Sequence, residues 1–465
     1  MIERTDVVIV GARCAGSAAA ATYARAGRKV TVLDRSSFPS DVLSTHVMFN
    51  AVFPDLKSIG ALDDVFAVGA LPIDRAVAVL DNGIDTAVEY TELVDPNGTV
   101  PIALNVRRTE LDEILVKAAR RAGADVREQC TVTGIRWRGG RAAGVTYRSA
   151  DGCEHHLDAD LVVGADGQQS TVAKLVGAET PYRFAHSNRG GVYRYVKDPI
   201  TDGPDSTTMY HWRDGSSLCF MFPTSPPGEV IVVFLVDRVE IPMARTDPEG
   251  FWERKLAHHP ALAKRLEGAH GGTKLRITEN LASYFRRSAG PGWALIGDAG
   301  HFKDPGLGQG IRDAIRAGCF IAEHTADILD QPAALDRALR KCEHERDRDC
   351  KLAYLVGLHQ ARILRESRGI VSLVPAFDEL GLPLLAAAGN RGRQLARTIS
   401  PRTIVGALAT TVRHADHRAE LVPGLVREGK LSAKLLLASY RGGFRDDRRI
   451  SELETAERPW NGAGS

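Results

Sequence analysis

Short runs of apolar residues recur at three distant places in the chain. They are Asp6–Val10, Asp160–Gly164 and Trp293–Ile296, and each is bounded by residues that favour turns. Short apolar runs without polar alternation are typical of strands covered on both faces, as in a parallel sheet. A glycine-containing or small-residue turn and then a helix-favouring segment follow each run. The pattern therefore predicts an α/β fold.

The first run opens a strand–turn–helix–strand unit of about 30 residues. The turn Gly11–Gly16 is followed by an alanine-rich segment, Ser17–Ala26, and by a second strand, Lys29–Leu33, which ends on Asp34. The first glycine permits a tight turn, and the last lets helix and strand approach closely. The free N–H groups of the helix start can face a pyrophosphate, and the Asp34 carboxylate can accept ribose hydroxyls. The unit is that of a dinucleotide-binding domain.

One position departs from the usual G-x-G-x-x-G turn. Arg13 stands where the middle glycine normally lets the backbone approach a phosphate. Either the turn opens slightly, or the guanidinium itself meets the pyrophosphate, for which its fork of donors is well suited.

The second and third runs also end at an acid. Asp166 and a glycine follow the second, with Ser170 as the expected N-cap of the next helix. Asp298 follows the third and precedes a glycine-rich loop, Ala299–Gly310, which leads into a helix from Ile311. Backbone N–H groups at such a helix start point outward, where the helix dipole favours negative charge.

Two loops contribute further candidates. Ser44, Thr45 and His46 follow the second strand, on the edge of the sheet where ligands bind; alternatively they only cap a helix expected from Val47. Another pair of candidates precedes the helix that contains Leu111, where Thr109 and Asp112 can form a capping pair. These are Arg107 and Arg108, of which one could reach an anion or both could be exposed.

Residues 179–276 change character, since strands rich in aromatic and β-branched residues follow one another without helices. Ile73–Tyr90 alternates around Asp81–Gly83 and reads as a hairpin. An antiparallel sheet, and hence a second domain, is expected. Alternation alone does not tell which face of this sheet is core and which could form a pocket wall. From Ala333 onward the chain reads mostly helical.

Composition narrows the class of protein. The 465 residues, 44% of them apolar, suit a globular protein of two or three domains. A net charge of +2 without a basic run does not indicate nucleic-acid binding, and no apolar run is long enough for a membrane span. The seven cysteines show no C-x-x-C, so neither a disulfide framework nor a zinc site is expected. With no room for a signal peptide, we expect a cytoplasmic protein.

Together, the Gly11–Gly16 turn with Asp34, the Asp166-Gly167 pair and the Gly297–Gly310 segment resemble the three fingerprints of the FAD-dependent aromatic-hydroxylase superfamily. These single-component flavoprotein monooxygenases share a fold with geranylgeranyl reductases and flavin halogenases. The resemblance implies a Rossmann-like FAD-binding domain (GR2-type), an inserted antiparallel β-sheet substrate domain and a C-terminal helical region. The expected boundaries are 1–75, 100–178 and 277–330 for the FAD-binding domain, 76–99 and 179–276 for the substrate domain, and 331–465 for the helical region.

The resemblance implies that Asp34 holds the adenosine ribose, Arg108 the FAD phosphates and Asp298 the ribityl chain or pyrophosphate, while Pro305–Gly310 runs beside the isoalloxazine. The expected cofactor-binding residues are Gly11, Ala12, Arg13, Ala15, Gly16, Asp34, Arg35, Ser44, Thr45, His46, Arg108, Val132, Asp166, Gly167, Gly297, Asp298, Pro305, Gly308, Gln309, Gly310 and Ile311. Besides Arg13, the chain departs from the family at Ala173, where an arginine is usual and a cation follows only at Lys174, and at Arg312, often a small or amide residue.

By this resemblance the chain is expected to hydroxylate a small, aromatic or polyketide-like substrate with NADPH or NADH as transient reductant and O2, through a flavin C4a-hydroperoxide. His46, His211 and Arg312 are the candidates for catalytic side chains. One alternative is an FAD-dependent reductase of a prenyl or polyketide C=C bond, and another is a non-catalytic flavin scaffold. A halogenase is disfavoured because the Trp-x-Trp-x-Ile-Pro motif is absent from the sequence. A monomer or homodimer without nucleic acid or membrane partners is expected.

Overall fold

A computed structural model describes residues 3–79, 85–89, 103–214, 217–279 and 281–362, together with residues 406, 409, 444, 445, 450, 451 and 454. The expected hairpin turn at Asp81–Gly83 lies outside the described residues, as does most of the expected helical region beyond residue 362. No helix in the described ranges combines the length and apolar character that a membrane crossing requires.

The three apolar runs become neighbouring strands of one six-stranded sheet. In spatial order its strands are β20 (Ala289–Gly290), β21 (Trp293–Leu295), β12 (Leu161–Gly164), β2 (Val7–Val10), β3 (Val30–Leu33) and β8 (Asp125–Arg127). All neighbouring pairs are parallel except β20 with β21. Because parallel strands end on the same edge, the turns after β2, β12 and β21 meet at one side of the sheet.

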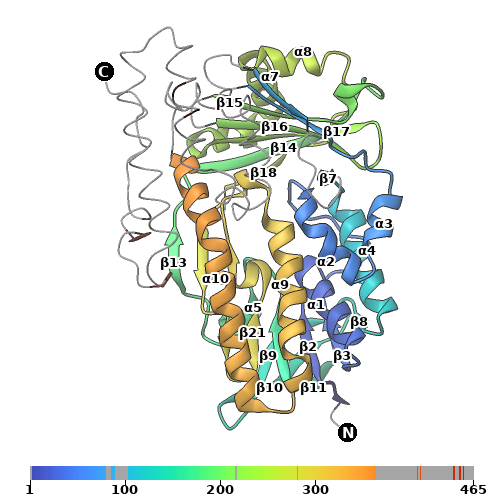
Figure 1. Ribbon diagram of the computed structural model, residues 1–465, viewed down its shortest axis with the longest axis vertical. Helices are drawn as coiled ribbons and strands as arrows, with labels where there is room; N and C mark the ends of the chain where they lie inside the picture. Colours follow the sequence, from blue (N-terminus) through green and yellow to red (C-terminus); the bar gives the residue numbers. More distant parts are fainter. Residues whose placement is uncertain are drawn as a thin grey trace.

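Helices cover one face of this sheet, and a small sheet, antiparallel except where β1 pairs with β11, covers the other. The helices are α1 (Cys14–Arg25), α4 (Arg108–Arg121) and α9 (Gly310–Thr325). Both α4 and α9 pack against α1, and the three share one apolar core with the sheet (Figure 1). The second layer contains β1 (Glu3–Arg4), β9 (Thr131–Arg138), β10 (Arg141–Arg148) and β11 (Glu154–Asp158), and packs with α5 (Thr171–Leu175) over a second core. The strand β8 precedes this layer in the sequence but pairs with β3 in the six-stranded sheet.

A seven-stranded sheet lies at one end of the molecule (Figure 1). Its order is β18 (Arg276–Thr278), β14 (Arg189–Lys197), β17 (Glu229–Asp237), β16 (Ser217–Thr224), β15 (Thr208–Asp214), β5 (Arg75–Val79) and β6 (Asp85–Glu89). One face packs on α6 (Ile241–Thr246), α7 (Pro248–His258) and α8 (Pro260–Arg265). The other face, with Tyr193, Tyr195 and Leu235, packs toward Val47 and Ile73. Both faces are apolar and buried, which is why alternation could not distinguish them.

The remaining elements connect these sheets. They are β4 (Val47–Phe49), α2 (Phe53–Ser58), α3 (Leu62–Ala67), β7 (Ala103–Asn105), β13 (Pro181–Ala185), β19 (Ser283–Arg286), β22 (His301–Phe302) and the long helix α10 (Pro332–Arg362). The helix expected from Val47 is wrong at its start, because Val47 pairs with Asn105 in an antiparallel ladder. Ser44, Thr45 and His46 therefore precede a strand and do not cap a helix.

The fold class is confirmed as α/β, with a mainly parallel sheet, an inserted sheet that is antiparallel except where β15 pairs with β5, and a helix that follows them. The domain boundaries stay a prediction.

Candidate functional site

A cavity of about 820 Å³ runs along the edge of the parallel sheet where β2, β3, β12 and β21 end, and it reaches the apolar face of the seven-stranded sheet. It brings together most of the residues singled out in the sequence. Those in its wall are Gly11, Arg13, Ala15, Asp34, Arg35, Ser44, Thr45, His46, Arg108, Val132, Asp166, Gly167, Gly297, Asp298, Pro305, Gly308, Gln309, Gly310 and Ile311.

Four candidates are not in that wall. Ala12 and Gly16 lie behind it in the turn and the first helix. His211 stacks on Phe220 in the seven-stranded sheet, with ring centroids 4.7 Å apart. Arg312 lies in the wall of a different cavity. The structure therefore brings His46, but neither His211 nor Arg312, to the large cavity.

The first turn is closed around Asp34. The carboxylate accepts hydrogen bonds from the backbone N–H of Ala12, at 2.6 Å, and of Ser36, at 2.8 Å. Gly11 has a φ of +102°, and a Cβ there would lie 2.5 Å from the carbonyl oxygen of Ala165. Glycine is needed at this position because β12 approaches so closely. The guanidinium of Arg13 lines the cavity and donates to the hydroxyl of Ser40 at 2.9 Å.

Arg13 and Arg108 share one buried carboxylate, that of Asp112. Arg108 donates to both oxygens, at 2.8 and 3.0 Å, and Arg13 forms an ion pair with Oδ2. The Asp112 side chain is fully buried, whereas Arg13 and Arg108 keep 24% and 11% of their side chains exposed at the cavity. The capping role expected for Asp112 is wrong, since Arg107 is the N-cap residue of α4 and no side chain among the described residues caps it. Two cations on one anion leave net positive charge at the turn, which suits a diphosphate.

Asp166 organises the second turn. Its carboxylate accepts from the backbone N–H groups of Thr171 and Val172, at 2.7 and 3.1 Å, and from the hydroxyl of Ser170. Ser170 is the N-cap of α5, as expected, because its hydroxyl oxygen accepts from Ala173 N–H at 2.9 Å. Burial raises the pKa of Asp166, and these hydrogen bonds oppose the shift.

Asp298 lies at the third turn, within 3_10 helix η5 (Gly297–Ala299). Burial raises its pKa to about 6, while the Arg108 charge, a hydrogen bond from Gln168 and the Lys303 charge act in the opposite direction. The third turn lies directly against the first, because a Cβ on Gly297 would lie 3.0 Å from the Cβ of Ala15. The first and third turns therefore form one wall.

Because the raised pKa penalises the Asp298 carboxylate, the cofactor-free protein should lose stability as pH rises from about 4 to about 6. In Asp298→Asn this penalty is absent. Chemical denaturation should show the variant gaining up to about 3 kcal/mol over wild type at neutral pH, and little at pH about 4. A stability difference that stays constant across this range would show that Asp298 does not titrate as described.

The loop before α9 is fixed by a buried ion pair from the seven-stranded sheet. Arg189, on β14, lies 3.6 Å from the carboxylate of Asp304, and both side chains are almost fully buried. Asp304 caps the short 3_10 helix η6 (Pro305–Leu307) by accepting from Gly306 N–H at 2.9 Å. No side chain among the described residues caps α9, so the N–H groups of its first turn remain available on the cavity side.

His46 joins the two sheets at the other end of the cavity. It is buried with a φ of +64°, and its Nε2 hydrogen-bonds the hydroxyl of Tyr195, on whose ring it stacks at 5.8 Å. Its Nδ1 has no hydrogen-bond partner among the described residues. Burial, then the charges of Arg108 and Arg107, lower its pKa well below 6.5, so the ring is neutral at neutral pH. A neutral imidazole in a strained backbone conformation is suited to exchanging a hydrogen bond or proton with a ligand.

Several lining residues were missed from the sequence. They include Cys14, Asp41, Leu43, Cys130, Gln168, Tyr193, Val233, Leu235, Thr278, Leu281, Phe302, Lys303 and Asp304. Tyr193 lies in the expected antiparallel sheet, whose core face and possible pocket face alternation could not distinguish. Cys14, Lys303 and Asp304 lie in segments that the sequence had already singled out. Val233, Leu235 and Thr278 had no local signal, because they reach the cavity through a sheet formed by distant strands. Gln168 had a signal: it directly follows the Asp166-Gly167 pair.

The cavity fits FAD. No side chain among the described residues caps α1 or α9. The first turn of α1 and the Arg13–Asp112–Arg108 cluster suit a diphosphate, and the start of α9 suits the electron-rich edge of an isoalloxazine. Asp34 adds a carboxylate near the first turn. The fold and the site together define a doubly wound flavin-binding protein.

Residues 4–348 match the FAD-binding-domain family, so the chain belongs to that family of FAD-dependent oxidoreductases. Digeranylgeranylglycerophospholipid reductase 2 of Methanothermobacter thermautotrophicus is 32% identical over 349 residues, or 73% of this chain and 82% of the relative. Among solved structures, the myxobacterial halogenase CndH has a TM-score of 0.69 at 20% identity, covering 88% of this chain and 97% of that chain. Aklavinone-11 hydroxylase, solved with FAD and aklavinone, has a TM-score of 0.63 at 22% identity, covering 77% and 69%. The two structures share the fold.

Proposed function

We propose that this chain is an FAD-dependent monooxygenase that uses NAD(P)H and O2 to hydroxylate a small aromatic or polyketide-like substrate. The observation that carries the proposal is the apolar wall opposite the loop Pro305–Gly310. Tyr193, Val233 and Leu235 from the seven-stranded sheet, with Leu281 and Phe302, line the ring end of the cavity. Such a wall suits a planar apolar substrate and excludes water from the reacting centre.

When bound, FAD supplies electron transfer from NAD(P)H and activation of O2. The chain's own residues hold and orient it. Asp34 and the first turn hold the adenosine and diphosphate part, and the start of α9 stabilises negative charge on the reduced ring. His46, neutral and hydrogen-bonded to Tyr195, is placed to orient a substrate hydroxyl through a hydrogen bond.

The test is a panel of phenols and polyketides screened for stimulated NAD(P)H oxidation, with product masses. We expect a product heavier by one oxygen atom, and no turnover without O2.

A second candidate, reduction of a C=C bond, is favoured by the identity to the digeranylgeranylglycerophospholipid reductase. Anaerobic turnover that yields a product heavier by two hydrogen atoms would establish that candidate and overturn hydroxylation.

Arg13 offers a test of how the diphosphate is held. If its guanidinium replaces the contact of the missing glycine, Arg13→Gly should weaken ADP and FAD binding about tenfold, the loss of one charged hydrogen bond. Arg13→Lys should lose less, because a cation is kept beside Asp112. Calorimetric titration of the cofactor-free protein measures both. Equal or tighter binding by Arg13→Gly would mean that the side chain only fills space.

A further inference from the structure

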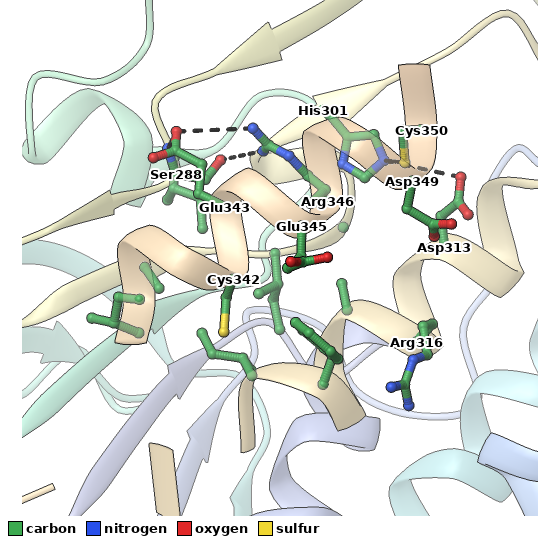
Figure 2. A pocket seen from close by; sticks show the side chains of 18 of the residues that line it. Ser288, His301, Asp313, Arg316, Cys342, Glu343, Glu345, Arg346, Asp349 and Cys350 are labelled. Carbon is green, nitrogen blue, oxygen red and sulfur yellow. Dashed lines mark hydrogen bonds and ion pairs between the residues drawn. The ribbon is translucent and has the colours of Figure 1, made fainter. Parts of the chain in front are cut away.

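A second cavity of about 260 Å³ lies between α9 and α10 (Figure 2). Its outer part is lined by Arg316, Cys342, Glu345 and Asp349, and its inner part by Ile296 and Gly297 at the third turn. At about 30 Å³ for each water molecule in the liquid, the volume is enough for several waters. Charged side chains in the wall favour a hydrated cavity.

The two cavities share part of their walls. Gly297, His301 and Asp313 are the described residues that line both of them. Of these, His301 and Asp313 carry groups that exchange protons, and both are almost fully buried. The wall that separates the second cavity from the proposed flavin end of the large cavity therefore contains side chains that can exchange protons.

The partition is a compact cluster. His301 Nε2 lies 3.4 Å from Cys350 Sγ and 3.9 Å from Asp313 Oδ2, and the three side chains point toward one another in Figure 2. Arg312 connects Asp313, at 3.2 Å, to Asp349, at 3.1 Å, whose side chain is 33% exposed. The cluster thus extends from the cavity partition to solvent.

Histidine, aspartate and cysteine could in principle ligate a metal. Here the carboxylate of Asp313 is already paired with the ammonium of Lys303 and the guanidinium of Arg312. The Asp313 carboxylate is therefore already engaged and is poorly placed to serve as a metal ligand as well.

We propose that His301 relays a proton from water in the second cavity to the flavin end of the large cavity. Oxidation of NAD(P)H by O2 without substrate follows NAD(P)H + H⁺ + O2 → NAD(P)⁺ + H2O2. Hydroxylation and C=C reduction likewise take up one solvent proton for each NAD(P)H. An imidazole accepts a proton on one nitrogen and gives one from the other. The proposal rests on the FAD position proposed above, but not on the choice between these reactions.

The test uses the FAD-loaded, substrate-free protein, reduced anaerobically and mixed with O2, with flavin absorbance as the readout. His301→Gln keeps a similar polar side chain that does not titrate. We expect its flavin reoxidation to slow about a hundredfold and, where proton delivery becomes limiting, to slow further in D2O. His270→Gln, an exposed histidine on the far sheet, is the matched control and should react as wild type.

Access through the second cavity is tested by rescue. Added imidazole should restore His301→Ala, and Ala317→Phe, which fills the second cavity, should block that rescue. FAD content and thermal melting verify that each variant is folded. Wild-type reoxidation in folded His301→Gln would overturn the relay alone, as would a slow His301→Ala that imidazole leaves unchanged. A wild-type protein that takes up no FAD would remove both the relay and the proposed function.

Discussion

Replacing Asp112 by alanine is expected to destabilise the protein by about 3–5 kcal/mol, the usual effect of removing one partner from a buried ion pair. The Asp112 side chain is fully buried and is the shared acceptor of Arg13 and Arg108. Without it, two guanidinium groups face each other with no anion between them. Both arginines also line the cavity, so the variant should lose FAD affinity together with stability.

Chemical denaturation and retained flavin absorbance measure the two effects. Glu113→Ala is the matched control, because Glu113 follows in the same helix but pairs with Lys117 at the surface; a change of at most about 0.5 kcal/mol is expected. Asp112→Asn keeps the shape without the charge and should fall between the two. If Asp112→Ala proved as stable as the control, the cluster would not be the structural centre described here.

Gly318→Ala should destabilise the protein by about 2 kcal/mol, although alanine is the better helix former by about 1 kcal/mol. Gly318 lies where α9 crosses α1. A Cβ there would lie 2.3 Å from the carbonyl oxygen of Ala15 and 2.8 Å from the backbone nitrogen of Ala19. Because the clash is with backbone atoms, α1 and α9 must move apart. The turn before α1, which we expect to hold the diphosphate, then moves away from α9.

Gly357→Ala provides the contrast within α10. Among the described residues, a Cβ at Gly357 would meet only the Asp304 Cβ, at 3.5 Å, which is an ordinary contact. We expect that variant to be as stable as wild type or more stable, by up to about 1 kcal/mol. Thermal melting of both variants decides the matter. Equal melting temperatures for the two would show that α1 and α9 are not as closely packed as described.

The sequence was sufficient for the parts of the fold that local pattern controls. Buried strands such as Val7–Val10 are continuous apolar runs. Gly11 is required because the backbone at Ala165 lies too close to leave room for a Cβ. The sequence also placed Asp34, Asp166 and Asp298 each just after a buried strand. All three acids line one cavity.

Contacts between distant segments could not be predicted in this way. Asp112 has the spacing of a capping residue, but its partner Arg13 is far away in sequence. Val47 begins a strand because Asn105 pairs with it, which no propensity reveals. Both faces of the seven-stranded sheet are apolar, so period alone could not assign Tyr193 to the cavity.

The central claim is that three segments distant in sequence hold one FAD in the large cavity. Its most direct test is calorimetric titration of the cofactor-free protein with FAD, beside Asp34→Ala. We predict one FAD for each wild-type chain and a large loss of affinity in the variant. No uptake by wild type, or equal affinity in the two proteins, would contradict the account.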